Sequence, residues 1–113
     1  MSEAQLRQEI CAVGATIHSR GLTHGATGNI SVRLADGWLM TPTGSNLGNL
    51  DPDRLSRLDG SGKHIAGDKP TKENFLHLAV YDQRPGSGAV VHLHATHSVA
   101  VSVLADLDPA DLL

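Results

Sequence analysis

Aromatic side chains are scarce in this sequence: Phe, Trp and Tyr together make up 3% of its 113 residues. A core must therefore take its volume from Leu, Val, Ile and Ala, and an apolar content of 40% is enough for one small domain over residues 1–113. Cysteine is almost absent as well. The single Cys11 excludes an internal disulfide and fits a reducing compartment.

Long apolar runs and clusters of basic residues are also missing. No segment approaches the roughly 20 apolar residues that span a bilayer, and the N-terminus lacks the basic-then-apolar pattern of a secretion signal. The 9 Lys and Arg are scattered and are outnumbered by 12 Asp and Glu, which gives a formal charge of −3. These absences argue against nucleic-acid and membrane partners, and they predict a cytoplasmic protein.

Histidine, by contrast, is abundant, with seven residues. His92 and His94 follow a β-branched pair at 90–91, and the pattern predicts a short buried strand after the turn at 86–88. Side chains alternate along a strand, so both imidazoles face the same way and can reach one metal ion, with Zn–N bonds of about 2.0–2.1 Å. A plain polar pair on a sheet face is the alternative, and the spacing alone does not decide between them.

Helices and strands are expected to alternate along the rest of the chain. A helix is predicted over 2–20, begun by a capping box of Ser2 and Gln5, with an apolar stripe that lies on a sheet. The other predictions are strands at 30–34, 38–40, 56–58 and 64–65, a short helical turn from Asp51, a helix from Pro70 to Gln83, and a helix over 98–105.

Glu73 falls in the first turn of the helix expected after Pro70. A carboxylate there is stabilised by the helix dipole, which is a purely structural explanation. The functional explanation is that a first-turn side chain is held rigidly and can reach the strand of His92 and His94. His77, one turn further along, is expected to pack or hydrogen-bond beneath such a site and not to bind metal.

Two loops, at 22–29 and 41–45, are rich in glycine and hydroxyl side chains. Each adjoins the end of a predicted strand, and the two strands pair through a hairpin at 36–37, so the loops should lie close together. Backbone N–H groups and hydroxyls could there surround a phosphate. Each loop on its own is more typical of a plain turn.

Four stretches resemble, in order and spacing, the class II aldolase and adducin family: 27–31 (TGNIS), 41–44 (TPTG), 70–73 (PTKE) and 92–94 (HLH). The longer stretches at 69–73 and 92–102 look most like the family branch that decarboxylates 3-oxo-tetronate 4-phosphate. The resemblance implies a three-layer α/β/α fold with a central, mostly antiparallel sheet. It also implies a homotetramer with zinc sites near the subunit interfaces.

The resemblance further implies a role for each motif residue. His92 and His94 would bind zinc, and Glu73 would be the acid/base, able to touch the metal when substrate is absent. Family members take a third zinc histidine from further along, so the chain resembles the N-terminal part of one, and the 113 residues alone are expected to be inactive. The implied phosphate-binding residues are Gly28, Asn29, Thr43, Gly44, Thr71 and Lys72.

Three functions stay open at this point. The first is a zinc-dependent decarboxylase of a phosphorylated sugar acid, giving dihydroxyacetone phosphate and CO2 through a metal-stabilised enediolate. The second is an aldolase, epimerase or dehydratase on another sugar phosphate, although such aldolases usually carry Ser-Ser-Glu at 71–73. The third is a non-catalytic adducin-like interaction module, which would need none of Glu73, His92 and His94. Zinc suits imidazole ligands, and Mn, Co and Fe bind similar sites.

Overall fold

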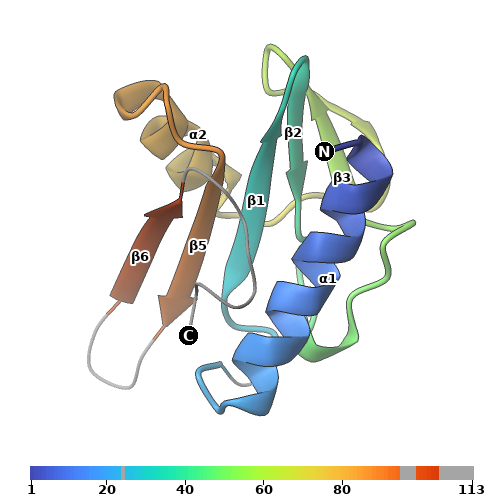
Figure 1. Cartoon of the computed structure of the whole chain (residues 1–113), viewed down its shortest axis with the longest axis vertical. Coiled ribbons are helices and arrows are strands. Elements are labelled where there is room, and N and C mark those ends of the chain that lie inside the picture. Colours follow the sequence, from blue (N-terminus) through green and yellow to red (C-terminus); the bar gives the residue numbers. More distant parts are fainter. Residues whose placement is uncertain (24, 95–98, 105–113) are drawn as a thin grey trace.

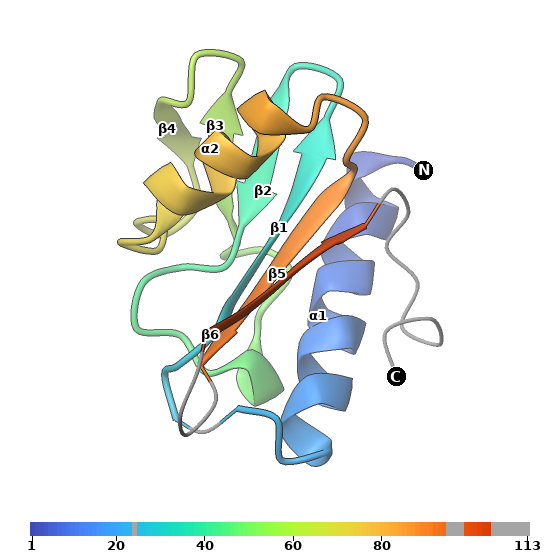
Figure 2. The same cartoon turned by 90° about the vertical axis from the view of Figure 1, so that its left-hand side faces the viewer.

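A computed structural model describes residues 1–23, 25–94 and 99–104. Within these ranges the six strands form one sheet in the order β4-β3-β2-β1-β5-β6, and every neighbouring pair is antiparallel. Helix α1 lies on one face of the sheet and α2 on the other (Figure 1, Figure 2), which confirms the expected α/β/α layers. The elements in chain order are α1 (Glu3–Ser19), β1 (Asn29–Leu34), β2 (Gly37–Met40), the 3₁₀ helix η1 (Leu47–Asn49), β3 (Ser56–Asp59), β4 (His64–Ala66), α2 (Asn74–Gln83), β5 (Ala89–His94) and β6 (Val99–Leu104).

Helix α1 begins and ends where its sequence predicts. Ser2 Oγ accepts from the backbone N–H of Gln5 at 3.1 Å, and the Gln5 side chain accepts from Ser2 N at 2.8 Å, which completes the capping box. Gly21 follows the helix with a φ of 70°, a conformation that glycine adopts without strain. Among the described residues, neither α-helix combines the length and the apolar character needed to cross a bilayer.

Strand β1 alternates in polarity, and the alternation divides the sheet into two faces. Its apolar side chains pack under α1. Its polar side chains face α2, where Ser31 contacts both His77 and Tyr81. The core on the α1 side is made up of Ile10, Val13, Ile17, Ile30, Val32, Leu39, Leu47, Leu55, Ala89 and Val91. At β1 the sheet therefore presents an apolar face to α1 and a polar face to α2.

The helix predicted over 98–105 is wrong, because residues 99–104 form strand β6. This strand pairs with β5 along its whole length, from Ala89 opposite Leu104 to His94 opposite Val99. Valines recur at every second position of the segment, which is the strand period, and β-branched residues favour strands. An apolar run of this length does not by itself distinguish a helix from a buried strand.

Two smaller expectations about helices also fail. No helical turn starts at Asp51: residues 52–54 form a plain turn, in which Asp51 Oδ1 accepts from Asp53 N at 2.9 Å. The 3₁₀ helix η1 comes earlier, where Asn46 Oδ1 caps Gly48 N at 2.8 Å. Phe75, expected on the apolar face of the helix after Pro70, is 69% exposed.

Candidate active site

The central contact of the candidate site joins the start of α2 to β5. His92 is 2% exposed, and its Nδ1 lies 2.5 Å from Oε2 of Glu73. The sequence predicts Glu73 in the first turn of the helix, but the structure places it one position earlier, as the N-cap residue before Asn74. The helix starts later because a turn precedes it, in which Thr71 O accepts from Asn74 N at 3.1 Å. The Glu73 carboxylate still reaches His92 from this position.

His77 lies behind this contact, fully buried, and links α2 to β1. Its Nδ1 lies 2.6 Å from Ser31 Oγ, which is in turn 2.8 Å from the Tyr81 hydroxyl. Its Nε2 is hydrogen-bonded to Oδ1 of Asn29. The His77 ring also stands edge-on to His92, with centroids 6.5 Å apart and an interplanar angle of 68°. The expectation that His77 hydrogen-bonds beneath the site is confirmed.

Burial sets the charge state of this network. It lowers the pKa of His77 from 6.5 to about 4, helped by nearby His92 and opposed by the Glu73 carboxylate. Burial likewise raises the pKa of Tyr81 well above its usual value of 10. Both groups are therefore neutral at pH 7, and the hydrogen bonds that link the side chains of His77 and Tyr81 to Asn29 and Ser31 join neutral groups.

The lowered pKa predicts that the fold loses stability in acid through His77. Unfolded His77 takes up a proton near pH 6.5, whereas the folded state resists it until about pH 4, so its contribution is intact above pH 6.5 and lost as the pH falls through 4. Between pH 7 and 4, the free energy of unfolding should fall by roughly 3 kcal/mol more in wild type than in His77→Gln. Urea unfolding at several pH values measures this difference. Parallel pH profiles for the two proteins would contradict it.

Two segments that carry implied phosphate-binding residues, the loop after β2 and the segment before α2, lie side by side. The loop after β2 pairs with the segment before α2 through a bridge of Pro42 with Pro70. Thr43 N donates to Lys69 O at 2.9 Å, and Thr71 N donates to Thr41 O at 3.2 Å. Residues 41–44 and 69–71 therefore run side by side.

Gly28 and Asn29 lie against the strand that carries His92. Asn29 is the register partner of His92 in the β1–β5 ladder. Gly28 has a φ of 82°, and a Cβ atom there would stand 3.1 Å from Thr23 Oγ1 and 3.4 Å from the carbonyl oxygen of His92. Only glycine combines this backbone conformation with so close an approach. The start of β1 is thereby held next to the contact between Glu73 and His92.

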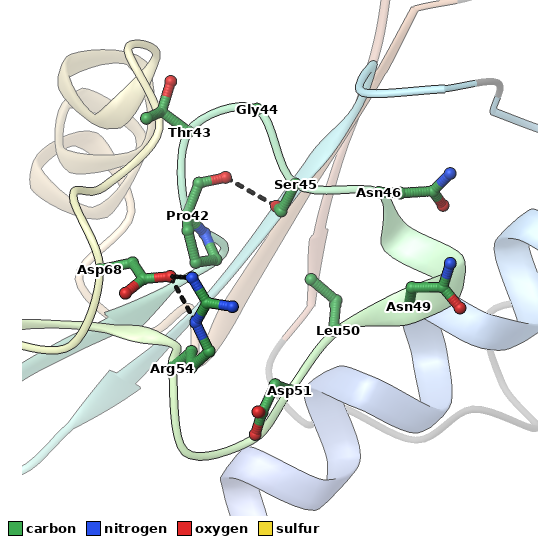
Figure 3. Close-up of a pocket in the computed structure, with 10 residues that line it drawn as sticks. All are labelled: Pro42, Thr43, Gly44, Ser45, Asn46, Asn49, Leu50, Asp51, Arg54 and Asp68. Atoms are coloured by element: carbon green, nitrogen blue, oxygen red, sulfur yellow. Dashed lines mark hydrogen bonds and ion pairs between the residues drawn. The ribbon is translucent and has the colours of Figure 1, made fainter.

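A cavity of about 270 Å³ opens beside the loop after β2 (Figure 3). Of the residues predicted to bind phosphate, only Thr43 and Gly44 line it, and the Thr43 side chain points away from the cavity's cation, Arg54. The Arg54 guanidinium forms an ion pair with Asp68 at 2.8 Å. Neither residue of this pair belongs to the motifs that carry the family resemblance. Because its charges compensate each other, the cavity offers no net positive charge from Arg54 to a phosphate.

Three further residues are named in the sequence predictions: Lys72, His94 and His97. Lys72 is exposed next to Glu73. His94 is the last residue of β5, two positions after His92, and its side chain lies outside the described residues. His97, expected beyond the strand end, lies outside them too. Within the described part, no three His, Cys, Asp or Glu side chains come together as a metal site.

A comparison with protein-family models identifies the family. The model described as "Class II Aldolase and Adducin N-terminal domain" matches residues 8–112. The chain belongs to the class II aldolase and adducin family. The fold expected for that family and the resemblance carried by the four motifs are both confirmed.

The relatives of this chain include proteins named as a decarboxylase and as an aldolase. It is 46% identical to a 3-oxo-tetronate 4-phosphate decarboxylase of Cupriavidus necator, over 99% of this chain and 52% of that protein. It is 41% identical to an L-fuculose phosphate aldolase of Escherichia coli, over 97% and 51%. The crystal structure of YgbL from Klebsiella pneumoniae superimposes with a TM-score of 0.81 at 46% identity, over 85% of this chain and 47% of that one. The chain spans about half the length of the relatives that it matches.

Proposed function

We propose that the complete protein is a metal-dependent lyase that decarboxylates a 3-oxo-tetronate 4-phosphate to dihydroxyacetone phosphate and CO2. The observation that carries the proposal is the contact between Glu73 and buried His92, which sets a carboxylate beside a potential metal ligand at 2.5 Å. The similarity to named decarboxylases, at 46% identity, supports this substrate class. The family resemblance adds a homotetramer to the proposal.

The side chains at this site are of the chemical types that bind a divalent metal, imidazole and carboxylate. With Nδ1 of His92 engaged by Glu73, its Nε2 is the nitrogen that would bind the ion, and a carboxylate on the other ring nitrogen is usual for metal-binding histidines. His94 would be the second ligand. A divalent ion bound there, zinc before Mn, Co or Fe, supplies Lewis-acid stabilisation of negative charge on the substrate oxygens, worth on the order of several kcal/mol.

Glu73 moves the proton that the reaction consumes. Loss of the substrate carboxylate as CO2 leaves its bonding electron pair as an enediolate across C2 and C3. A proton must then reach C2 to give dihydroxyacetone phosphate. The Glu73 carboxyl is one-third exposed, so it can meet substrate while its Oε2 keeps contact with His92. In this proposal Glu73 delivers the proton, and the paired segments 41–44 and 69–71 hold the phosphate with Asn29.

An aldolase acting on another sugar phosphate is the second candidate, supported by 41% identity to an L-fuculose phosphate aldolase. Both reactions pass through an enediolate, so the metal and phosphate residues do not separate them. The test is to supply the complete, metal-loaded protein with 3-oxo-tetronate 4-phosphate and, separately, with a ketose 1-phosphate. Release of CO2 matched by dihydroxyacetone phosphate supports the decarboxylase. Cleavage of the ketose phosphate without CO2 from the acid would replace it with the aldolase.

Lys72 provides a prediction that tells the two substrates apart. It is exposed between Thr71 and Glu73, where an ammonium group can meet the extra negative charge of a substrate carboxylate. Lys72→Ser should lower kcat/KM for the sugar acid by about 10- to 100-fold, the size of one charge-assisted contact, and should hardly affect a neutral-headed ketose 1-phosphate. An equal fall for both substrates would assign Lys72 to the phosphate. No fall for either would leave it as a solvated surface lysine.

A further inference from the structure

We propose that His77 is a positioning residue, which fixes the side-chain amide of Asn29 so that its NH2 group faces the substrate phosphate. The inference rests on the proposed function in one respect only, that Asn29 contacts the phosphorylated substrate. It is carried by a continuous chain of buried hydrogen bonds from α2 to β1: Tyr81 to Ser31, Ser31 to His77, and His77 to Asn29.

The spacing of the two elements makes this chain possible. His77 and Tyr81 are four residues apart on α2, a rise of about 6 Å along one helix face. Asn29 and Ser31 are two residues apart on β1, a rise of about 6.6–6.8 Å on one strand face. The near match lets His77 contact both strand residues while Tyr81 contacts the second. All four side chains are at least 96% buried, so water does not compete for these bonds.

The direction of each hydrogen bond follows from the amide oxygen of Asn29. An amide oxygen only accepts, so His77 carries its proton on Nε2 and donates to Asn29 Oδ1. Nδ1 of the neutral ring is then an acceptor, and the Ser31 hydroxyl donates to it. Ser31 Oγ in turn accepts from the Tyr81 hydroxyl. Each donor in this chain meets an acceptor. Reversing every bond, with Asn29 donating to His77, His77 to Ser31 and Ser31 to Tyr81, would leave the buried Tyr81 hydroxyl proton without an acceptor in the chain.

Flipping the Asn29 amide would break the arrangement. With the His77 tautomer unchanged, the NH2 group of Asn29 would then face Nε2–H of His77, two buried donors in contact. With the tautomer changed, the chain would reverse and the Tyr81 hydroxyl proton would lose its acceptor, and either outcome is strongly disfavoured where water is excluded. His77 thereby holds the amide oxygen inward and turns the amide nitrogen to the opposite side. Since Asn29 is the register partner of His92, that nitrogen is presented beside the candidate metal ligand. His77 needs no contact with substrate to have this effect.

A double-mutant cycle in the complete protein tests the inference, with binding of inorganic phosphate and of dihydroxyacetone phosphate measured by calorimetry. Asn29→Ala and His77→Phe should each weaken binding of both ligands about tenfold, the loss of one oriented hydrogen bond. The double variant should bind no more weakly than Asn29→Ala alone, because His77 acts through Asn29. His77→Gln, whose amide can still donate to Asn29, should restore most of the affinity. Asp82→Asn, an exposed change on α2, is the control and should bind as wild type does.

Turnover gives a second readout that a purely structural role would not move. Folded His77→Phe should raise KM for the phosphorylated substrate about tenfold and leave kcat within about twofold. If that variant does not fold, Ser31→Ala replaces it in the cycle, because loss of the Ser31 hydroxyl frees His77 to change tautomer and Asn29 to flip. Wild-type phosphate affinity in a folded variant, losses that multiply in the double variant, or no phosphate binding by wild type would each overturn the inference.

The outcomes also separate this inference from the proposed function. Coupling between the two residues in phosphate binding, without any CO2 release by the wild type, would uphold the positioning role and reject the decarboxylase. CO2 release with independent effects of the two substitutions would do the reverse.

Discussion

Glu73→Gln is expected to lower kcat for decarboxylation by about 10²- to 10⁴-fold, the usual contribution of a general acid or base. The glutamine has the same shape but has no proton to exchange with the enediolate carbon. The fold should survive, because the Glu73 side chain makes no cap hydrogen bond to α2 and is one-third exposed. Steady-state rates at saturating substrate, together with thermal unfolding of the same samples, measure both effects.

The same substitution separates catalysis from the structural explanation of Glu73. A carboxylate kept only for the helix dipole contributes about 0.3–1 kcal/mol to stability and nothing to the rate. Asp82→Asn, which removes an exposed carboxylate elsewhere on α2, is the matched control and should keep wild-type kcat. A Glu73→Gln enzyme with near-normal kcat would remove Glu73 from the mechanism.

Elements fixed by local chemistry were predictable from the sequence. The capping box of Ser2 and Gln5 starts α1, and a tight turn joins β1 to β2 at 35–36, one position before the predicted 36–37. In both cases the deciding interactions lie within a few residues of each other. The segment at 99–104 was mispredicted because its outcome depends on a distant partner, β5, which supplies a full ladder of backbone hydrogen bonds. Phe75 was mispredicted for a similar reason: it is apolar, but its sequence position does not show which face of α2 packs on the sheet.

In the candidate site, the contact between neighbouring elements was predictable from the sequence and the longer-range hydrogen bonds were not. Placing Glu73 near the strand of His92 required only a helix start and a neighbouring strand, and the structure shows the contact. The link from His77 to Asn29 spans 48 positions and depends on α2 lying over the polar face of β1. A signal for it was present, since polar residues alternate along β1 and His77 and Tyr81 share a helix face. Pairing the two patterns requires the topology, which the sequence pattern does not supply.

Replacing either His92 or His94 by Ala is expected to abolish stable metal binding and, with it, turnover. In the proposed site these two imidazoles are the core of the donor set, and losing one would leave too few ligands to hold the ion through dialysis. Metal content should fall from about one ion per chain to near zero in both variants, measured by atomic emission after dialysis. His97→Ala and His77→Gln are the controls and should retain the ion.

His92 is buried, so its truncation alone could disturb the fold. The stability lost with the metal must therefore be measured separately from the stability lost with the packing of the side chain. An ion that binds only the folded state raises the unfolding temperature, so a chelator should lower the Tm of the wild type. The same chelator should leave the Tm of His92→Ala and His94→Ala unchanged, whatever their starting values. His92→Gln, closer in volume, should behave like His92→Ala in metal content but lose less stability. Unchanged metal stoichiometry in both alanine variants would show that these histidines are a polar pair on the sheet and that the ion, if any, is bound elsewhere.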